Sequence, residues 1–212
     1  MTIYFWWTNK KRYEDIHTDR LTEIEYTPGG SAQNSLRTAS WILKQPNAAT
    51  FMGCVGKDTN AEIMRAKAAE VGLKTVYQVN EKVPTGTCAV LCTGNDRSLV
   101  AHLGAANSFT EHHLDDPENW AYVEKAKIHY VSGFFFTVCP PAIKRIAQYS
   151  LENNRTFAIN LSATFLSEFF KDRIIEVLPY VDIIFGNDDV INHLHLLSLS
   201  LSIERIKDVN YM

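Results

Sequence analysis

The stretch "YTPGGSAQNSL" contains the residues with the clearest capacity for ligand chemistry. Its adjacent Gly29 and Gly30 let a ligand approach the backbone without steric conflict. Ser31 is the expected N-cap of a helix predicted over 31–44, and Asn34 projects from the same end one turn later. Backbone amides and an asparagine side chain can donate to and accept from neutral hydroxyls, as a sugar diol requires. Because the spacing fits neither G-x-x-x-x-G-K-S/T nor G-x-G-x-x-G, a hydroxyl-binding loop and a plain capped turn both stay open.

Two phenylalanines follow predicted strands, at the position where parallel sheets usually bind ligands. Phe134 comes after the strand predicted at 127–133, and Phe165 comes after the strand predicted at 156–162. Ligands of parallel α/β sheets collect at the carboxyl ends of the strands, and an aromatic ring there can stack on a flat heterocycle. An ordinary core role for both side chains is the alternative, because aromatic residues mostly supply buried area.

A β-hairpin predicted across 86–105 offers one side of a pocket. Two strand-like runs flank the turn-forming cluster "NDR". Alternation along the second run puts Leu99, Ala101 and Leu103 on one face, which suits the wall of a planar pocket. Arg97 is expected at the turn, where it either reaches an anion or is only solvated.

The cysteines and histidines do not form a metal motif. Cys88 and Cys92 are expected on one strand face because their separation is even, whereas Cys54 and Cys139 stand apart among apolar neighbours. A zinc site needs two more ligands at compatible spacing, so we expect four buried free thiols in a reducing compartment. The histidine pairs at 112–113 and at 193 and 195 have no carboxylate cluster beside them, so we expect them on the surface.

Alternating strands and helices are expected to position these residues. The 212 residues are 46% apolar and 21% charged and can bury a substantial core, while the net charge of −3 gives no reason to expect nucleic acid as a partner. No apolar run approaches the ~20 residues that span a bilayer. The order of elements predicts a parallel α/β sheet covered on both faces. Strands are predicted at 48–56, 73–79, 127–133, 156–162 and 181–187, and crossover helices at 60–72, 117–126, 140–153 and 164–178.

The two ends of the sequence depart from this pattern. Residues 1–20 are crowded with aromatic and basic side chains and start no clear strand. In the tail at 191–212, "LLSLSLSI" alternates leucine with serine, which indicates either an amphipathic strand or low-complexity sequence. The tail is therefore expected to diverge from the rest of the chain.

Several segments, taken in order, resemble the adenosine kinases of the ribokinase-like, or PfkB, carbohydrate kinase family. They cover roughly residues 20–190 in the family's order, and "PTGTC" with "NDRSL" separates adenosine kinases from sugar kinases. The resemblance implies one partial domain over 1–212, a three-layer α/β/α sheet with a small β lid that is incomplete at both ends. It places the 86–105 hairpin next to the substrate pocket. The matching segments include "GGSAQNS", "ATFMGCVGKD", "PTGTCAVLCTGNDRSLVAHLGAAN", "GFFFTV", "ENNRTFAINLSATF" and "LPYVDIIFGN".

The resemblance assigns roles to residues that the pattern left open. It implies that the glycine loop holds ribose hydroxyls, that the hairpin helps enclose the nucleoside, and that the two phenylalanines flank the adenine. Arg97 would lie toward the transferred phosphate, and Asn187 would belong to an N-x-x-E motif for phosphate and, indirectly, magnesium. Val190 occupies the glutamate position of that motif and cannot order Mg²⁺ and its waters. The implied substrate-binding residues are Gly29, Gly30, Ser31, Asn34, Cys88, Leu99, Ala101, Leu103, Phe134 and Phe165.

The implied activity is phosphoryl transfer from ATP to adenosine with Mg²⁺, which gives AMP and ADP in purine salvage. Two family features have no counterpart in the 212 residues: the aspartate of the first strand and the G-A-G-D segment that supplies the catalytic base. We therefore expect a truncated chain that is inactive alone, and no catalytic residue is assigned. The alternative is a non-catalytic relative that binds a nucleoside or a partner protein. A Rossmann-type oxidoreductase is disfavoured because its glycine motif is absent.

The resemblance also predicts the molecular setting. Adenosine and ATP are the expected partners, without nucleic acid or membrane. Family members are usually monomeric, and for this chain dimer formation or binding to a partner stays open. The expected location is the cytoplasm, with the nucleus as a second compartment.

Overall fold

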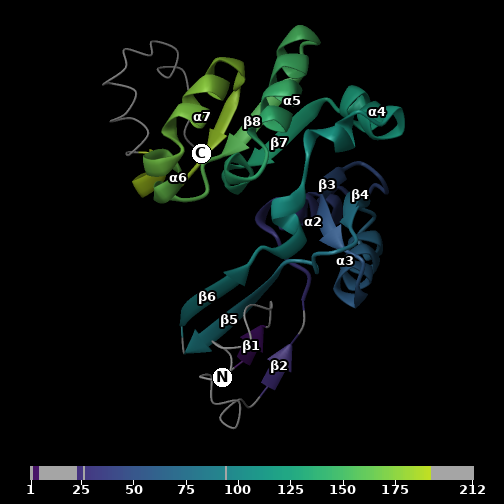
Figure 1. Ribbon diagram of the computed structural model, residues 1–212, viewed down its shortest axis with the longest axis vertical. Helices are drawn as coiled ribbons and strands as arrows, with labels where there is room; N and C mark the ends of the chain where they lie inside the picture. The colour runs from purple at the N-terminus through teal and green to yellow at the C-terminus, as the bar shows by residue number, and fades with distance from the viewer. Residues whose placement is uncertain (1, 5–22, 26, 94, 192–212) are drawn as a thin grey trace. The chain divides into compact units, whose positions relative to one another are not determined.

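The computed structural model describes residues 2–4, 23–25, 27–93 and 95–191. The chain folds into two compact units, Met1–Phe109 and Thr110–Met212. Figure 1 shows the strands and helices of both units. No helix in the described ranges is long and apolar enough to cross a membrane.

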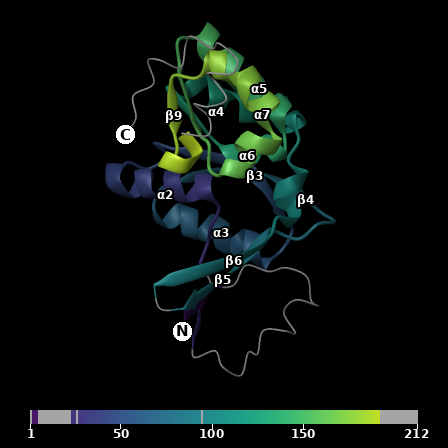
Figure 2. The same cartoon turned by 90° about the vertical axis from the view of Figure 1, so that its left-hand side faces the viewer.

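A parallel pair of strands forms the α/β part of the first unit. β3 (Thr50–Gly56) pairs with β4 (Lys74–Asn80) along its whole length, and the crossover helix α3 (Thr59–Glu70) connects them. Tyr77 on β4 packs with residues of β3 and α3, and its hydroxyl donates a 2.6 Å hydrogen bond to Gln33 of α2 (Ser31–Leu43). The two helices therefore reach the same face of this sheet, and Figure 2 shows them one above the other.

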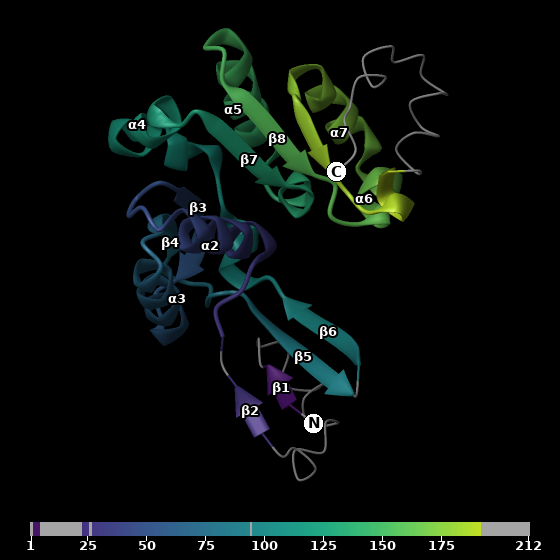
Figure 3. The same cartoon turned by 180° about the vertical axis from the view of Figure 1, so that it is seen from behind.

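A long antiparallel ribbon forms the second sheet of this unit. β5 (Thr87–Thr93) and β6 (Asp96–His102) pair along seven residues each, as the predicted hairpin required. β1 (Thr2–Tyr4) pairs antiparallel with β5, and β2 (Glu23–Glu25) pairs parallel with β1 (Figure 3). The expectation that residues 1–20 start no strand was therefore wrong. A three-residue strand is too short to show the alternation by which strands are recognised. After β6 the chain continues into the 3₁₀ helix η2 (Gly104–Ser108).

Three parallel strands organise the second unit. β7 (Ile128–Ser132), β8 (Thr156–Asn160) and β9 (Ile183–Phe185) lie in that order, and α5 (Pro140–Glu152) packs against β7 and β8. α7 (Lys171–Val177) contacts α5, and Figure 1 shows both helices along the sheet. The buried core of this unit joins the sheet to these helices. It includes Val131, Phe136, Ile143, Ala147, Phe157, Ile159, Leu166, Ile174 and Val177.

The helix predicted over 164–178 is divided into two. α6 (Thr164–Phe169) ends at Phe170, whose φ of −122° interrupts the helix before α7 begins. Leu166 of α6 and Ile174 of α7 are both buried in the core of this unit. The remaining elements of the unit are α4 (Pro117–Lys125) and the 3₁₀ helices η3 (Glu111–Leu114), η4 (Gly133–Thr137) and η5 (Leu178–Tyr180).

Each unit contains parallel strands that pair with one another. Within the described residues they form a two-stranded sheet in the first unit and a three-stranded sheet in the second. The α/β class is confirmed, because α3, α5 and the segment formed by α6 and α7 each connect neighbouring parallel strands. The helix predicted at 117–126 is not a crossover of this kind, because α4 follows the antiparallel strand β6 in the chain. In the second unit, Ile128, Ile183 and Phe185 on the sheet face opposite the core stay exposed.

Candidate functional site

The glycine loop leads into α2 with a backbone that only glycine adopts readily. Gly30 has a φ of +93° and is the N-cap of α2, and its carbonyl accepts the first helical hydrogen bond from the Asn34 N–H at 2.8 Å. The prediction that Ser31 is the N-cap was wrong, because Ser31 is already the first helical residue. The left-handed turn at Gly30 moves the start of the helix one residue earlier than a serine cap would. Gly29 is buried, whereas Gly30, Ser31 and Asn34 are exposed.

Gln33 and Asn34 are neighbours in the sequence but have different surroundings. The Gln33 side chain is 0% exposed, and its Oε1 accepts the hydrogen bond from the Tyr77 hydroxyl, while its Nε2 has no partner. Burial raises the pKa of Tyr77 to about 12, so the phenol stays a donor. Asn34 keeps its amide at the surface, with Oδ1 3.4 Å from Nη1 of Arg37. Gln33 therefore fixes the helix, and Asn34 is the side chain that a ligand can reach.

One face of the β5–β6 ribbon carries most of the predicted hairpin residues. The register pairs Cys88 with Ala101 and Val90 with Leu99, so these four side chains share a face. Leu99 is 61% exposed, which leaves an apolar surface accessible to a ligand. Cys88 and Cys92 also share this face, as the even spacing predicted. Burial raises the pKa of the Cys88 thiol, which keeps it protonated near neutral pH.

Two predicted hairpin residues lie elsewhere than expected. Arg97 is not in the turn but inside β6, where it pairs with Cys92 on the same face as Leu99. The ladder continues to the pair Thr93–Asp96, so the turn is shorter than "NDR" suggested. Leu103 follows β6 with helical backbone angles and precedes η2, so it is not part of the strand alternation.

The carboxylate of Asp58, which no sequence motif marked, connects the β3–β4 sheet to the segment that enters the β5–β6 ribbon. Asp58, the N-cap of α3, accepts hydrogen bonds from Ala61 N–H at 3.0 Å and from the Thr85 N–H and hydroxyl at 2.7 Å each. The Thr85 Oγ1 in turn accepts from Gly56 N–H at 2.9 Å. Thr85 therefore connects the end of β3 to the segment that enters β5. An aspartate before a helix signals a cap, but its contact with a threonine 27 residues away has no sequence signal.

The two predicted aromatic residues come together after β7 and β8. Phe134 lies in η4 and Phe165 in α6, and their ring centroids are 6.3 Å apart with planes tilted by 34°. The side chains are 45% and 40% exposed, so neither is a core residue. Ser162 lies between the strand ends, and its Oγ accepts from the Gly133 N–H at 3.1 Å. No sequence pattern marks Ser162, because a serine in a loop has no distinctive spacing to its neighbours.

The predicted phosphate and metal motif after β9 has a structural explanation. The Asn187 Oδ1 accepts from the Val190 N–H at 3.0 Å, as the N-cap of the helical residues that begin at 188. Val190 is buried in the core of the second unit, so no ligand can contact its side chain. Asp188 and Asp189 are exposed. Within the described residues, no three His, Cys, Asp or Glu side chains gather in a way that could hold a metal ion.

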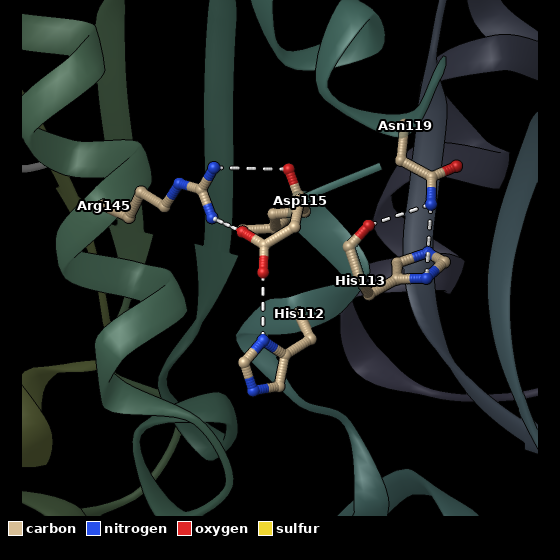
Figure 4. A network of polar contacts seen from close by, with 6 residues as sticks. His112, His113, Asp115, Asn119 and Arg145 are labelled. Atoms are coloured by element: carbon tan, nitrogen blue, oxygen red, sulfur yellow. Dashed lines mark hydrogen bonds and ion pairs between the residues drawn. The ribbon is translucent and has the colours of Figure 1, made fainter. Parts of the chain in front are cut away.

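The first predicted histidine pair belongs to a polar network that joins η3 to α5 and α4 (Figure 4). Asp115 accepts from Arg145 at 2.6 Å and contacts the His112 Nδ1 at 2.9 Å. The hydrogen bond from His112 and the contact with Arg145 lower the pKa of Asp115. His112 is exposed, as predicted, and Asn119 donates to the His113 carbonyl at 2.9 Å. The network connects elements at the surface and forms no reactive group. His193 and His195 lie outside the described residues.

All four cysteines are free, as predicted, although their burial differs. Cys54 and Cys139 are buried, whereas Cys88 and Cys92 are only partly buried, contrary to the expectation of four buried thiols. The ribbon has an open face, so its cysteines keep contact with solvent.

Known proteins match the chain over most of its length. The model of the pfkB family of carbohydrate kinases matches residues 1–204. Adenosine kinase 2 of Arabidopsis thaliana is 47% identical over 181 residues, which are 82% of this chain and 52% of that protein. The adenosine kinase of Dictyostelium discoideum is 43% identical over 180 residues, which are 82% of this chain and 53% of that protein. The chain thus spans about half the length of the curated relatives it matches.

Solved structures of adenosine kinases also resemble this chain. Anopheles gambiae adenosine kinase in complex with P1,P4-di(adenosine-5) tetraphosphate superposes with a TM-score of 0.78 at 46% identity, covering 81% of this chain and 52% of that chain. Adenosine kinase from Schistosoma mansoni in complex with adenosine superposes with a TM-score of 0.83 at 30% identity, covering 96% of this chain and 58% of that chain.

Proposed function

Because this chain belongs to the pfkB family of carbohydrate kinases, as its motifs predicted, we propose that it contributes the nucleoside-binding part of an ATP-dependent adenosine kinase. The proposed reaction is attack of the adenosine 5′-hydroxyl on the γ-phosphorus of ATP, which gives AMP and ADP in purine salvage. The proposal places the protein in the cytoplasm or nucleus. It is supported by similarity to the adenosine kinases of Arabidopsis thaliana and Dictyostelium discoideum.

The observation that carries this proposal is the exposed aromatic pair after β7 and β8. Phe134 and Phe165 keep close to half of their surface accessible, although phenylalanine is usually buried. Their rings lie near one another at the carboxyl ends of parallel strands, where α/β proteins bind ligands. Stacking on an aromatic ring stabilises a bound base by about 1–3 kcal/mol. We assign the purine of adenosine to this pair.

The first unit, taken by itself, offers groups suited to hydroxyls and to a phosphate. In the glycine loop, Gly29 and Gly30 allow close approach, and Ser31 and Asn34 offer exposed polar atoms to ribose hydroxyls. The ribbon has an apolar face, and Arg97 on that face supplies positive charge. The residues assigned to substrate binding in this part of the unit are Cys88, Leu99 and Ala101 on the ribbon and Leu103 directly after β6.

We propose that Mg²⁺ binds together with ATP. The described residues contain no three-ligand cluster, and the Asn187 side-chain oxygen already accepts a backbone hydrogen bond. We therefore assign the ion to the phosphates of ATP. Phosphoryl transfer depends on positioning and charge stabilisation. For this, the first unit offers the positive charge of Arg97, and the second unit offers the side-chain amide of Asn187.

Adenosine binding to the purified 212-residue chain tests the aromatic assignment. We expect Phe134→Ala and Phe165→Ala each to weaken adenosine binding by roughly tenfold or more in calorimetric titration, because each removes a stacking surface. Phe169→Ala is the matched control, since Phe169 lies on α6 and is 77% exposed but is not part of the pair. Equal affinities for all three variants and the unmodified chain would contradict the assignment.

Turnover by the same polypeptide is a separate test. The 212 residues contain no G-A-G-D segment, so we expect no ATP-dependent AMP formation from adenosine when they are produced alone. The measurement is radiolabelled AMP after long incubation with Mg²⁺ and ATP. Turnover above background that is abolished by Asn34→Ala would overturn this expectation. Binding without turnover is also the behaviour of the alternative, a nucleoside-binding relative without catalysis.

A further inference from the structure

Ser162 has an unusual backbone conformation at the end of β8. Its φ is +63°, in the left-handed region that few residues other than glycine and asparagine adopt. Among the described residues, three other non-glycine residues have a positive φ: two are asparagines, and the third, Lys44, is the C-cap of α2. Ser162 is neither an asparagine nor a helix C-cap. A conformation of this kind persists only where the surrounding contacts enforce it.

The contacts around Ser162 connect the ends of two strands. Its N–H donates to the Asn160 Oδ1 at 2.7 Å, and its hydroxyl lies 3.2 Å from the Asn160 carbonyl. On the β7 side, the same hydroxyl accepts from the Gly133 N–H at 3.1 Å and lies 3.2 Å from the Ser132 hydroxyl. The left-handed turn directs the hydroxyl toward β7, so one oxygen joins the two loops.

Gly133 allows the loops to approach this closely. A Cβ added at Gly133 would lie 2.6 Å from the Asn160 carbonyl oxygen and 2.8 Å from the Leu161 carbonyl oxygen. A side chain there would therefore push the two loops apart. Phe134 follows Gly133 directly, and Phe165 follows Ser162 by three residues, so the contact sets the distance between the aromatic rings.

We propose that Ser162 is a positioning residue, whose hydroxyl holds the β7 and β8 loops so that Phe134 and Phe165 can receive a purine base. This inference rests on the proposed function, because it concerns the same aromatic pair. A flat base needs about 3.5 Å to each ring that it stacks on. Two such contacts require about 7 Å between the rings, so a pair with centroids 6.3 Å apart needs to open by less than 1 Å to admit a base. Without the hydroxyl bridge the two loops would move independently, and the rings would hold this separation for a smaller fraction of the time.

The test separates the hydroxyl from the strained backbone. Ser162→Ala removes the hydroxyl and keeps a residue that disfavours positive φ, whereas Ser162→Gly removes the hydroxyl and tolerates that φ. We expect both variants to bind adenosine roughly fivefold to tenfold more weakly in calorimetric titration, the range that the loss of one hydrogen bond covers. Ser162→Gly should unfold at a higher temperature than Ser162→Ala, because both lose the hydroxyl but only glycine tolerates the positive φ. We expect both variants to bind free adenine more weakly by the same factor, because Phe134 and Phe165 are proposed to contact the base.

Ser167→Ala is the matched control. Ser167 is a buried serine of the same unit, and its Oγ has no hydrogen-bond partner. We expect this variant to bind adenosine and adenine as the unmodified chain does. If Ser162→Gly also binds like the unmodified chain, Ser162 has only a structural role and the inference is wrong.

A double variant keeps this inference distinct from the proposed function. Phe134→Ala should weaken adenosine binding clearly in the unmodified chain but by less than about threefold in the Ser162→Gly background, because the pair is already displaced. If Phe134→Ala is equally harmful in both backgrounds, the positioning role fails while the aromatic site stands. If Phe134→Ala has no effect in either background, or the unmodified chain does not bind adenosine, the proposed function fails and this inference with it.

Discussion

Replacing Asp58 by alanine should loosen the base of the β5–β6 ribbon and destabilise the first unit. The carboxylate caps α3 and also accepts two hydrogen bonds from Thr85, which is buried. Loss of an N-cap costs about 1 kcal/mol. A buried backbone N–H left without its acceptor costs about 1–3 kcal/mol more, which here concerns the Thr85 N–H. We therefore expect the free energy of unfolding to fall by about 2–4 kcal/mol.

Urea unfolding followed by circular dichroism measures this change. Asp116→Ala is the matched control, because Asp116 caps α4 through a single bond to the Glu118 N–H and is exposed. Asp116→Ala should lower the free energy of unfolding by no more than about 1 kcal/mol, the effect of losing one N-cap. Hydrogen exchange of the Gly56 and Thr85 amides should accelerate in Asp58→Ala only. Equal destabilisation by the two substitutions would show that the contact with Thr85 contributes nothing, and the reasoning would be refuted.

The pH dependence provides an independent check on Asp58. Burial by itself raises the pKa of this carboxyl, but hydrogen bonds from Thr85, Ala61 and Asn60 outweigh burial and hold the pKa below its ordinary value. With the folded-state pKa lowered, the stabilisation is present above the unfolded-state value of about 3.9 and is lost as the pH falls through the folded-state pKa. The stability difference between the unmodified chain and Asp58→Asn should therefore shrink between pH 5 and pH 3, about the range of that transition. A difference that stays constant over this range would contradict the assignment.

Three further substitutions have expected outcomes. Burial lowers the pKa of His129, whose side chain hydrogen-bonds Ser150. As the pH falls, the unfolded chain takes up a proton first, so the free energy of unfolding should decrease below about pH 6.5. In urea unfolding at several pH values, the free energy of unfolding of His129→Gln should depend less on pH. Gly86→Ala places a Cβ 2.4 Å from the Leu103 carbonyl oxygen, and thermal unfolding should show a loss of about 1–3 kcal/mol. Tyr77→Phe removes the hydrogen bond to α2 and should cost about 1–3 kcal/mol in urea unfolding, because it leaves a buried amide without a partner.

Local patterns in the sequence were sufficient for the elements and for the family. Period-two and helical spacing identified β3 to β9 and the helices between them, because side chains on one face of an element recur at fixed intervals. The hairpin register also followed from alternation, which placed Cys88, Leu99 and Ala101 on one face. The loop and strand-end segments were enough to identify the family, because their residue types and order are specific to it.

Errors arose where a local rule competed with a neighbouring one. Ser31 is a good N-cap by type, but the positive φ of Gly30 ends the loop one residue earlier. Arg97 lies beside turn-forming residues, but the strand ladder extends past it. In both cases the backbone hydrogen bonds of the folded chain decide the boundary, and the residue type alone does not.

The contacts that position the candidate site could be decided only by the tertiary structure. Tyr77 and Gln33 are 44 residues apart, Gly133 and Ser162 are 29 apart, and Thr85 and Asp58 are 27 apart. A hydrogen bond needs its atoms within about 3 Å and well aligned, and only the packed fold brings such distant residues to that distance. The sequence by itself determined which polar, aromatic and small side chains stand at loop and strand-end positions, because residue type and local period can be read along the chain. Which of them are held in place, and by what partner, depends on non-local geometry that no local pattern records.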